Sequence, residues 1–171
     1  MKQSVVVSRL DLTDLKSLYE CRLRALKNSP TAFLTTYEET QENGFEAFAE
    51  RFKANDDSNS VYVGKDGDQI VAMAGIHQQS RPKLKHKAYI WGVYVDKSYR
   101  GQGLGTQLIE QLVVHAREKM TVTSVYLSVE ETNSSAKKLY ERLGFRVWGT
   151  EPRAMYDAKN YYDETHLVLH L

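Results

Sequence analysis

The spacing of apolar residues divides the chain into helical and extended segments. Apolar side chains recur every three or four positions from Leu12 to Leu26, which predicts an amphipathic helix that ends at Asn28-Ser29-Pro30. A shorter helix is predicted from about Phe45 to Phe52. Runs rich in β-branched and aromatic residues predict strands at 5–9, 61–63, 70–76, 88–95, 125–129, 145–150 and 165–169. Strands, then strand–helix alternation, then strands imply a mixed sheet with helices on both faces.

A glycine-rich segment between a strand end and a helix start is the most informative local pattern. Val93 and Val95 end a strand, and apolar residues from Leu104 to Val113 repeat at helical spacing. Between them, Gly101, Gly103 and Gly105 lack the side chains that would block a close approach. Free backbone N–H groups at the positive end of a helix dipole favour an anion, and we expect a diphosphate there.

The spacing of these glycines narrows the choice of diphosphate. The dinucleotide pattern G-x-G-x-x-G fails, because the last position is occupied by Thr106. The nucleoside-triphosphate loop fails as well, because no Gly-Lys-Ser/Thr follows. The pattern Arg/Gln-x-x-Gly-x-Gly/Ala is met by Arg100, Gly103 and Gly105. Here the chain resembles the GNAT superfamily of acyl-CoA-dependent N-acetyltransferases, in which this loop holds the diphosphate of coenzyme A. An ordinary tight turn between strand and helix is the alternative.

A second segment, after the predicted strand 125–129, strengthens the resemblance. Asn133, Ala136, Tyr140 and Leu143 share one helical face, with Asn133 as a plausible N-cap. The pattern Asn-x-x-Ala-x-x-Leu-Tyr-x-x-x-Gly-Phe resembles the other conserved segment of the GNAT superfamily. The resemblance implies that the small Ala136 leaves room for the cofactor and that Tyr140 acts on its departing sulfur. The alternative for Tyr140 is a half-buried aromatic of an amphipathic helix.

The resemblance implies a single α+β domain over residues 1–171. Its sheet is expected to be mixed but mostly antiparallel, with six to seven strands and about four helices on its two faces. The implied activity is direct transfer of an acetyl group from acetyl-CoA to a primary amine in a ternary complex, with coenzyme A as product and no metal. The implied cofactor-binding residues are Val93, Tyr94, Val95, Arg100, Gly101, Gln102, Gly103, Leu104, Gly105, Thr106, Asn133, Ala136 and Tyr140. A bulge at Gly92 would turn a backbone N–H toward the acetyl carbonyl.

The general base is the least defined part of this site. The strand from Ala88 to Tyr94 contains no carboxylate, so the glutamate that some relatives carry there is missing. We take Glu38 as the candidate base, with water as a possible relay. The other candidates considered are Glu39, His77 and Glu130.

The acceptor is expected beside two tyrosine-containing segments. The resemblance places it near Tyr37 and Glu38 and near Tyr161 and Tyr162, in a connection that also holds Tyr156, Asp157, Asp163 and Glu164. Aromatic rings with carboxylates suit a cationic amine. Small polyamines, amino acids, aminoglycoside-like drugs and protein or peptide amines all remain open, and ordinary turn residues are the alternative.

Composition and charge exclude several other classes. A net charge of +1 with no basic stripe argues against nucleic-acid binding, and the basic residues between Arg81 and Lys87 fit a solvated hairpin edge. The single Cys21 is expected to be a small core residue rather than a nucleophile. His166 and His170 are four apart in a predicted strand, too far to share a metal. Without a long apolar run or signal-like start, we expect a soluble cytoplasmic protein without a membrane partner. Homodimer formation stays open.

Two other functions stay open at this stage. A non-catalytic acyl-CoA-binding sensor or partner subunit would need the glycine loop but no hydroxyl at the sulfur, so Tyr140 favours the enzyme. A nucleotide-binding protein using the same loop is the third class.

Overall fold

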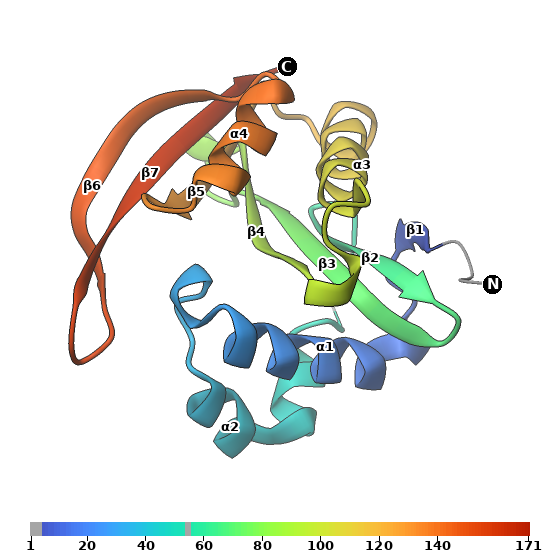
Figure 1. Ribbon diagram of the computed structural model, residues 1–171. Coiled ribbons are helices and arrows are strands. Elements are labelled where there is room, and N and C mark those ends of the chain that lie inside the picture. Colours follow the sequence, from blue (N-terminus) through green and yellow to red (C-terminus); the bar gives the residue numbers. More distant parts are fainter. Residues whose placement is uncertain (1–4, 54–55) are drawn as a thin grey trace.

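The computed structural model describes residues 5–53 and 56–171, which form a seven-stranded sheet flanked by helices on both faces (Figure 1). The strand order is β1-β2-β3-β4-β5-β7-β6. All neighbouring strands pair antiparallel except β4 and β5, which are parallel. The expected mixed, mostly antiparallel sheet is therefore confirmed. The strands are β1 (Val6–Arg9), β2 (Asn59–Asp66), β3 (Gln69–Gln78), β4 (Lys87–Val95), β5 (Ser124–Glu130), β6 (Arg146–Tyr156) and β7 (Tyr161–His170).

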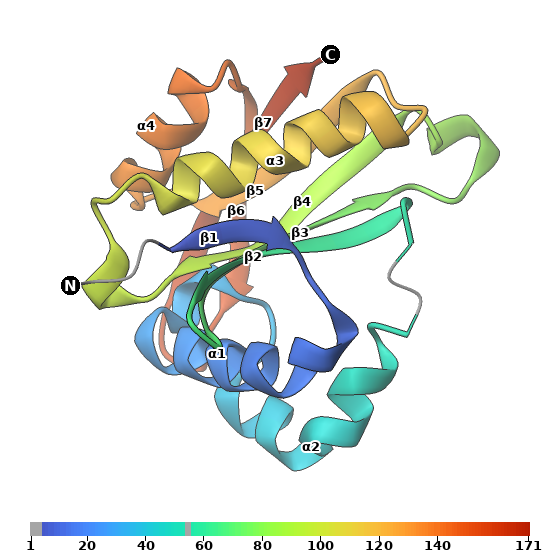
Figure 2. The same cartoon turned by 90° about the vertical axis from the view of Figure 1, so that its right-hand side faces the viewer.

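The helices divide between the two faces and give each its own core. The α-helices are α1 (Leu15–Asn28), α2 (Tyr37–Glu50), α3 (Leu104–Lys119) and α4 (Ser134–Arg142). α3 and α4 cover one face of the sheet and α1 and α2 the other (Figures 1 and 2). The first core is built around Leu108, Leu112 and Phe145, and the second around Leu18, Val63 and Ile70. None of the helices in the described part of the chain combines the length and apolarity that crossing a membrane requires.

The second helix begins earlier than its apolar spacing predicts. α2 starts at Tyr37 because Thr36 and Glu39 form a capping box, each side chain accepting from the other residue's backbone N–H. Gly44 interrupts the helix with φ 75° and ψ 175°, so the predicted segment from Phe45 corresponds to its second half. The first half of α2, before Gly44, is polar and has no apolar residues at helical spacing, so the sequence pattern predicts only the second half.

The long connection expected between the predicted strands 145–150 and 165–169 is wrong. β6 and β7 continue through it as one long antiparallel hairpin, and only residues 157–160 form the connection. Asp157 closes this turn by accepting from the backbone N–H groups of Lys159 and Asn160 at 2.9 and 2.8 Å. Tyr161 and Tyr162 are strand residues, in keeping with the high β-propensity of tyrosine.

The two parallel strands separate soon after they meet. β4 and β5 pair only through Lys87–Tyr89 and Ser124–Tyr126. Beyond these residues the strands diverge, and β4 has β3 alone as its neighbour from Ile90 to Val95. The sheet therefore opens at its centre, between the helix pair on one face and the helix pair on the other (Figure 1).

Candidate active site

A large open cleft occupies the gap between the diverging strands. Its volume is about 1410 Å³. It is lined by the end of β4, the glycine loop, the end of β5 and one face of α4. Of the cofactor-binding residues predicted from the sequence, it is bordered by Val93, Tyr94, Val95, Arg100, Gly101, Gly103, Leu104, Gly105, Thr106, Asn133, Ala136 and Tyr140. Gln102 is not among the lining residues, and its amide donates to the carbonyl of Ser98.

The glycine loop has the backbone that its sequence predicts. Gly101 and Gly103 adopt φ 74° and 80°, a region that side chains disfavour, and Gly103 is the N-cap of α3. A Cβ on Gly105 would lie 3.1 Å from Leu139 Cδ1, so the third glycine allows α3 and α4 to approach each other. The N-terminal N–H groups of α3 thus border the cleft without side chains in front of them, which suits a phosphate group.

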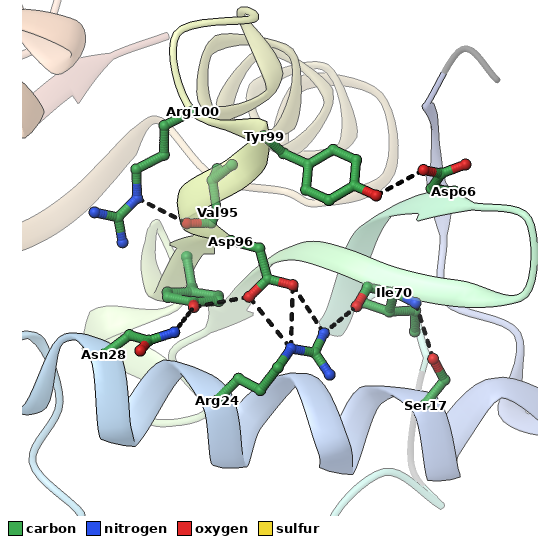
Figure 3. Close-up of polar contacts among 10 residues, drawn as sticks. Ser17, Arg24, Asn28, Asp66, Ile70, Val95, Asp96, Tyr99 and Arg100 are labelled. Atoms are coloured by element: carbon green, nitrogen blue, oxygen red, sulfur yellow. Dashed lines mark hydrogen bonds and ion pairs between the residues drawn. The ribbon is translucent and has the colours of Figure 1, made fainter. Parts of the chain in front are cut away.

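Tyr94 contributes its backbone to the cleft, while its ring belongs to the opposite core. The side chain is 4% exposed and packs among α1 and α2 residues. Its hydroxyl donates to Asp96 Oδ1 at 2.8 Å and accepts from Asn28 Nδ2 at 2.9 Å. Arg100 Nε donates to the carbonyl of Val95 at 2.9 Å, which holds the start of the glycine loop against the strand end (Figure 3).

A partly buried ion pair fastens α1 to the same strand end. Arg24 Nη2 lies 2.9 Å from Asp96 Oδ2 and also donates to the carbonyl of Ile70 at 2.6 Å (Figure 3). The Asp96 carboxylate raises the pKa of Arg24 beyond its usual range, against the opposing effect of burial. Sequence reasoning missed this pair, although an acidic residue directly between a strand and a glycine loop was a visible signal.

Tyr140 lies on α4 and is one of the residues that line the cleft. Asn133 caps this helix by accepting from the N–H of Ala136 at 3.2 Å, as expected. The Tyr140 side chain is 5% exposed and packs edge-on against Phe145, with ring centroids 6.1 Å apart. Burial raises the pKa of its phenol well above the usual value, so the hydroxyl stays protonated at physiological pH.

A β-bulge at Gly92 separates the cleft from a second space. The pairing of β3 with β4 shifts between Met73 and Gly75, and Gly92 adopts φ 64°. The bulge predicted from the sequence is therefore present. On its α1 side lies a cavity of about 230 Å³ between α1, α2, β3 and β4. Cleft and cavity share four lining residues: Arg22, Thr35, Trp91 and Gly92.

Comparison with known proteins decides the family. A model described as "Acetyltransferase (GNAT) family" matches residues 18–145, which is most of the chain. The chain belongs to the GNAT family. The GNAT fold is also that of yncA from Salmonella typhimurium, solved with its cofactor acetyl-CoA, at a TM-score of 0.85 and 19% identity over 99% of this chain and 95% of that one.

Curated GNAT relatives match part of the chain. A spermine/spermidine N(1)-acetyltransferase from Bacillus subtilis is 31% identical over 86 residues, 49% of this chain and 57% of the relative. An L-2,4-diaminobutyric acid acetyltransferase from Streptomyces anulatus is 25% identical over 111 residues, 64% of this chain and 61% of the relative. The chain thus spans about three fifths of the length of these relatives.

Most candidate base and acceptor residues of this GNAT chain lie away from the cleft, and of those named from the sequence only Glu130 and Glu164 are among its described lining residues. Glu38 is exposed in the first turn of α2 and lines neither space, and neither does Tyr37, whose ring lies 4.3 Å from Lys27 Nζ. Tyr161 and Tyr162 also lie outside the linings of both spaces. The ring of Tyr161 stacks on that of Tyr156, and the hydroxyl of Tyr162 donates to Asp157.

The other candidate bases are also poorly suited to the role, either by position or by the bonds they already make. Glu39 closes the capping box of α2, and His77 lines neither space. Glu130 does border the cleft, but its carboxylate accepts from the backbone and hydroxyl of Thr132 at 2.9 and 2.7 Å. We carry none of these residues forward as the base.

Cys21 is a core residue, as its helical position predicts. It is 0% exposed, and burial raises the pKa of its thiol to about 12. The thiolate that a nucleophile requires is therefore disfavoured.

The strand register gives His166 neighbours that its sequence spacing does not show. Glu151, Glu164 and His166 each place a ligand atom within 4.8 Å of the others. The Glu151 side chain is 59% exposed, and we assign no ion to this group.

Proposed function

We propose that the protein transfers an acetyl group from acetyl-CoA directly to an amine, with the two substrates on opposite sides of β4. The observation that carries the proposal is the meeting of the cleft and the cavity at the Gly92 bulge. Because residues around the bulge border both spaces, a cofactor in the cleft and an acceptor in the cavity would meet beside it. Direct transfer requires such an approach of the two reacting groups.

The residues of the cleft fit coenzyme A. Gly101, Gly103 and the N-terminus of α3 would hold its diphosphate, and the β4 backbone from Val93 to Val95 would bind its pantetheine arm as a neighbouring strand does. When bound, acetyl-CoA supplies the thioester that the amine attacks and the thiol that leaves. The other residues that we propose bind coenzyme A are Arg100, Leu104, Gly105, Thr106, Asn133, Ala136 and Tyr140.

Two groups of this chain would stabilise charge during the proposed transfer. The bulge at Gly92 frees backbone from regular pairing where an N–H would polarise the acetyl carbonyl. Tyr140, buried and protonated, would donate a hydrogen bond to the departing sulfur. Burial makes full proton transfer from this phenol less favourable still than the ordinary pKa values of phenol and thiol imply. We therefore assign Tyr140 a hydrogen-bonding role.

The acceptor amine is expected to lose its proton to water. Among the described residues that line the cavity there is no carboxylate and no histidine. The relatives described above are named as acetyltransferases of spermine, spermidine and diaminobutyric acid, all of them amines, and this supports the acceptor class.

A binding measurement followed by a turnover measurement tests the proposal. Calorimetry should detect acetyl-CoA binding, and a panel of amines should include at least one that releases the free thiol. Tight binding with no turnover of any amine would instead support the non-catalytic acyl-CoA sensor. Absence of acetyl-CoA binding would refute both.

A further inference from the structure

The cavity on the α1 side of β4 carries positive charge. Its polar lining consists of Arg22, Thr35, Thr40, Arg51 and Asn59. In the described part of the chain, neither arginine forms a salt bridge, and none of the residues that line the cavity is acidic. A space of this kind repels ammonium groups and attracts an anion.

Arg22 is held so that one side of its guanidinium is left free. Nη2 donates to Thr35 Oγ1 at 2.8 Å, and the group lies 4.3 Å above the ring of Phe33. Nη1 is buried and has no hydrogen-bond partner among the described residues. Burial, reinforced by the charge of Arg51, lowers the pKa of Arg22 to about 10, so the group is still charged at neutral pH. A buried, charged donor without a partner is costly, and a ligand anion would relieve that cost.

The free nitrogen also lies close to the proposed site of transfer. A Cβ built on Gly92 would be 3.9 Å from Arg22 Nη1, so the unpartnered nitrogen lies beside the bulge that both spaces share. An anion bound there would be within a few bonds of an amine at the bulge. That separation matches a carboxylate and an amine on the same carbon.

The rest of the cavity is small and apolar. Its volume of about 230 Å³ lies below the usual range of roughly 300–1,000 Å³ for ligand pockets. The wall includes Phe48, Phe52, Met73 and Trp91. The indole lies directly on Gly75, where a Cβ would come within 2.3 Å of Trp91 Cε2. Such a wall suits one apolar side chain rather than a polyamine, an aminoglycoside or a folded protein end.

We propose that the acceptor is a small apolar α-amino acid, whose carboxylate is bound by Arg22 Nη1 with Arg51 adding a second positive charge. This inference rests on the proposed acetyl transfer and specifies its substrate class. The arrangement also opposes protonation of the bound amine, because nearby positive charge disfavours an ammonium ion. The tyrosine- and carboxylate-containing hairpin, from which the sequence predicted a cationic acceptor, plays no part in it.

Matched acceptors test the role of the carboxylate. Thiol release would be measured with L-phenylalanine, L-phenylalaninamide and phenethylamine, with the leucine series L-leucine, L-leucinamide and 3-methylbutylamine, and with spermidine. The free amino acids should exceed their amides and decarboxylated amines in kcat/KM by roughly 10- to 100-fold, the effect of one hydrogen-bonded charge pair. Equal or better use of the amides, the decarboxylated amines or spermidine would overturn the inference while leaving acetyl transfer intact.

Variants of Arg22 separate recognition from catalysis. Arg22→Gln should bring the preference for the free amino acid to within about threefold, with acetyl-CoA affinity unchanged by calorimetry. Arg22→Lys should keep part of the preference, and Arg51→Gln should reduce it less. Lys16→Gln, on the exposed side of the same helix, removes a charge as a control and should leave the preference unchanged. An unaltered preference in folded Arg22→Gln would contradict the assignment.

A direct binding measurement decides the case in which no amine is turned over. L-phenylalanine and phenethylamine would be titrated into the protein saturated with coenzyme A, and the same titrations repeated with Arg22→Gln. Binding of L-phenylalanine but not of phenethylamine, with that binding lost in Arg22→Gln, would support the carboxylate site even if the proposed acetyl transfer failed. No binding of the amino acid to the native protein would overturn it.

Discussion

Replacing Tyr140 by phenylalanine isolates the contribution of its hydroxyl to the transfer. The ring is 5% exposed and packs on Phe145, so phenylalanine keeps the packing and removes only the hydroxyl. A hydrogen bond to a charged group contributes about 1.5–3 kcal/mol. At 1.4 kcal/mol per factor of ten, kcat should fall roughly 10- to 100-fold, while the dissociation constant of acetyl-CoA changes little.

The assay measures release of the free thiol at saturating substrate. Single-turnover rates are measured as well, because they report the chemical step separately from product release. Tyr126→Phe is the matched control, because Tyr126 stacks on Tyr89 and lies outside the cleft lining. Because burial raises the pKa of Tyr140, its protonated form predominates below that raised value, and native kcat should show no basic limb between pH 7 and 10. A normal single-turnover rate in Tyr140→Phe would refute the hydrogen-bonding role.

Two substitutions and one labelling experiment test the glycine loop, the ion pair and the buried thiol. Gly105→Glu adds bulk 3.1 Å from Leu139 and a like charge near the diphosphate, so acetyl-CoA affinity should fall at least tenfold, about 1.4 kcal/mol; unchanged calorimetric affinity would place the diphosphate elsewhere. Asp96→Ala leaves the Arg24 guanidinium without its carboxylate and should lower the free energy of unfolding in urea by about 2–3 kcal/mol, and a loss below about 0.5 kcal/mol would contradict this. Cys21, with its pKa raised to about 12 by burial, should react with a thiol reagent at pH 8 only after unfolding, so rapid labelling of the native protein would be inconsistent with this environment.

The local structure of the glycine loop and of α4 could be predicted because it is dictated by backbone geometry. Gly101 and Gly103 occupy positive φ, where few other residues are tolerated, so the need for glycine at these two positions is visible in the sequence itself. The face of α4 that carries Ala136 and Tyr140 follows from helical spacing in the same way. Glycine conformation and helical spacing are local rules, and the loop and helix that they predict are present in the structure.

The cavity on the α1 side of β4 could not be predicted because it depends on tertiary packing. Nothing along α1 distinguishes the cavity-lining Arg22 from an arginine on a solvated helix face. Gly75, inside a continuous apolar strand, was a usable signal for a close contact, but only the β3–β4 register shows that Trp91 makes it. The long β6–β7 hairpin was missed for a related reason, since strand pairing outweighs the turn-like composition around Tyr161.

The wall shared by the cleft and the cavity links the affinities of whatever occupies them. Arg22, Thr35, Trp91 and Gly92 border both spaces, so a ligand on one side acts on the residues that receive the ligand on the other. Thermodynamic reciprocity requires that the factor by which the first ligand alters binding of the second equals the factor in the reverse direction. A substitution in this wall that alters the coupling free energy therefore changes each dissociation constant measured with the other ligand bound, even where the affinity of either ligand alone is unchanged.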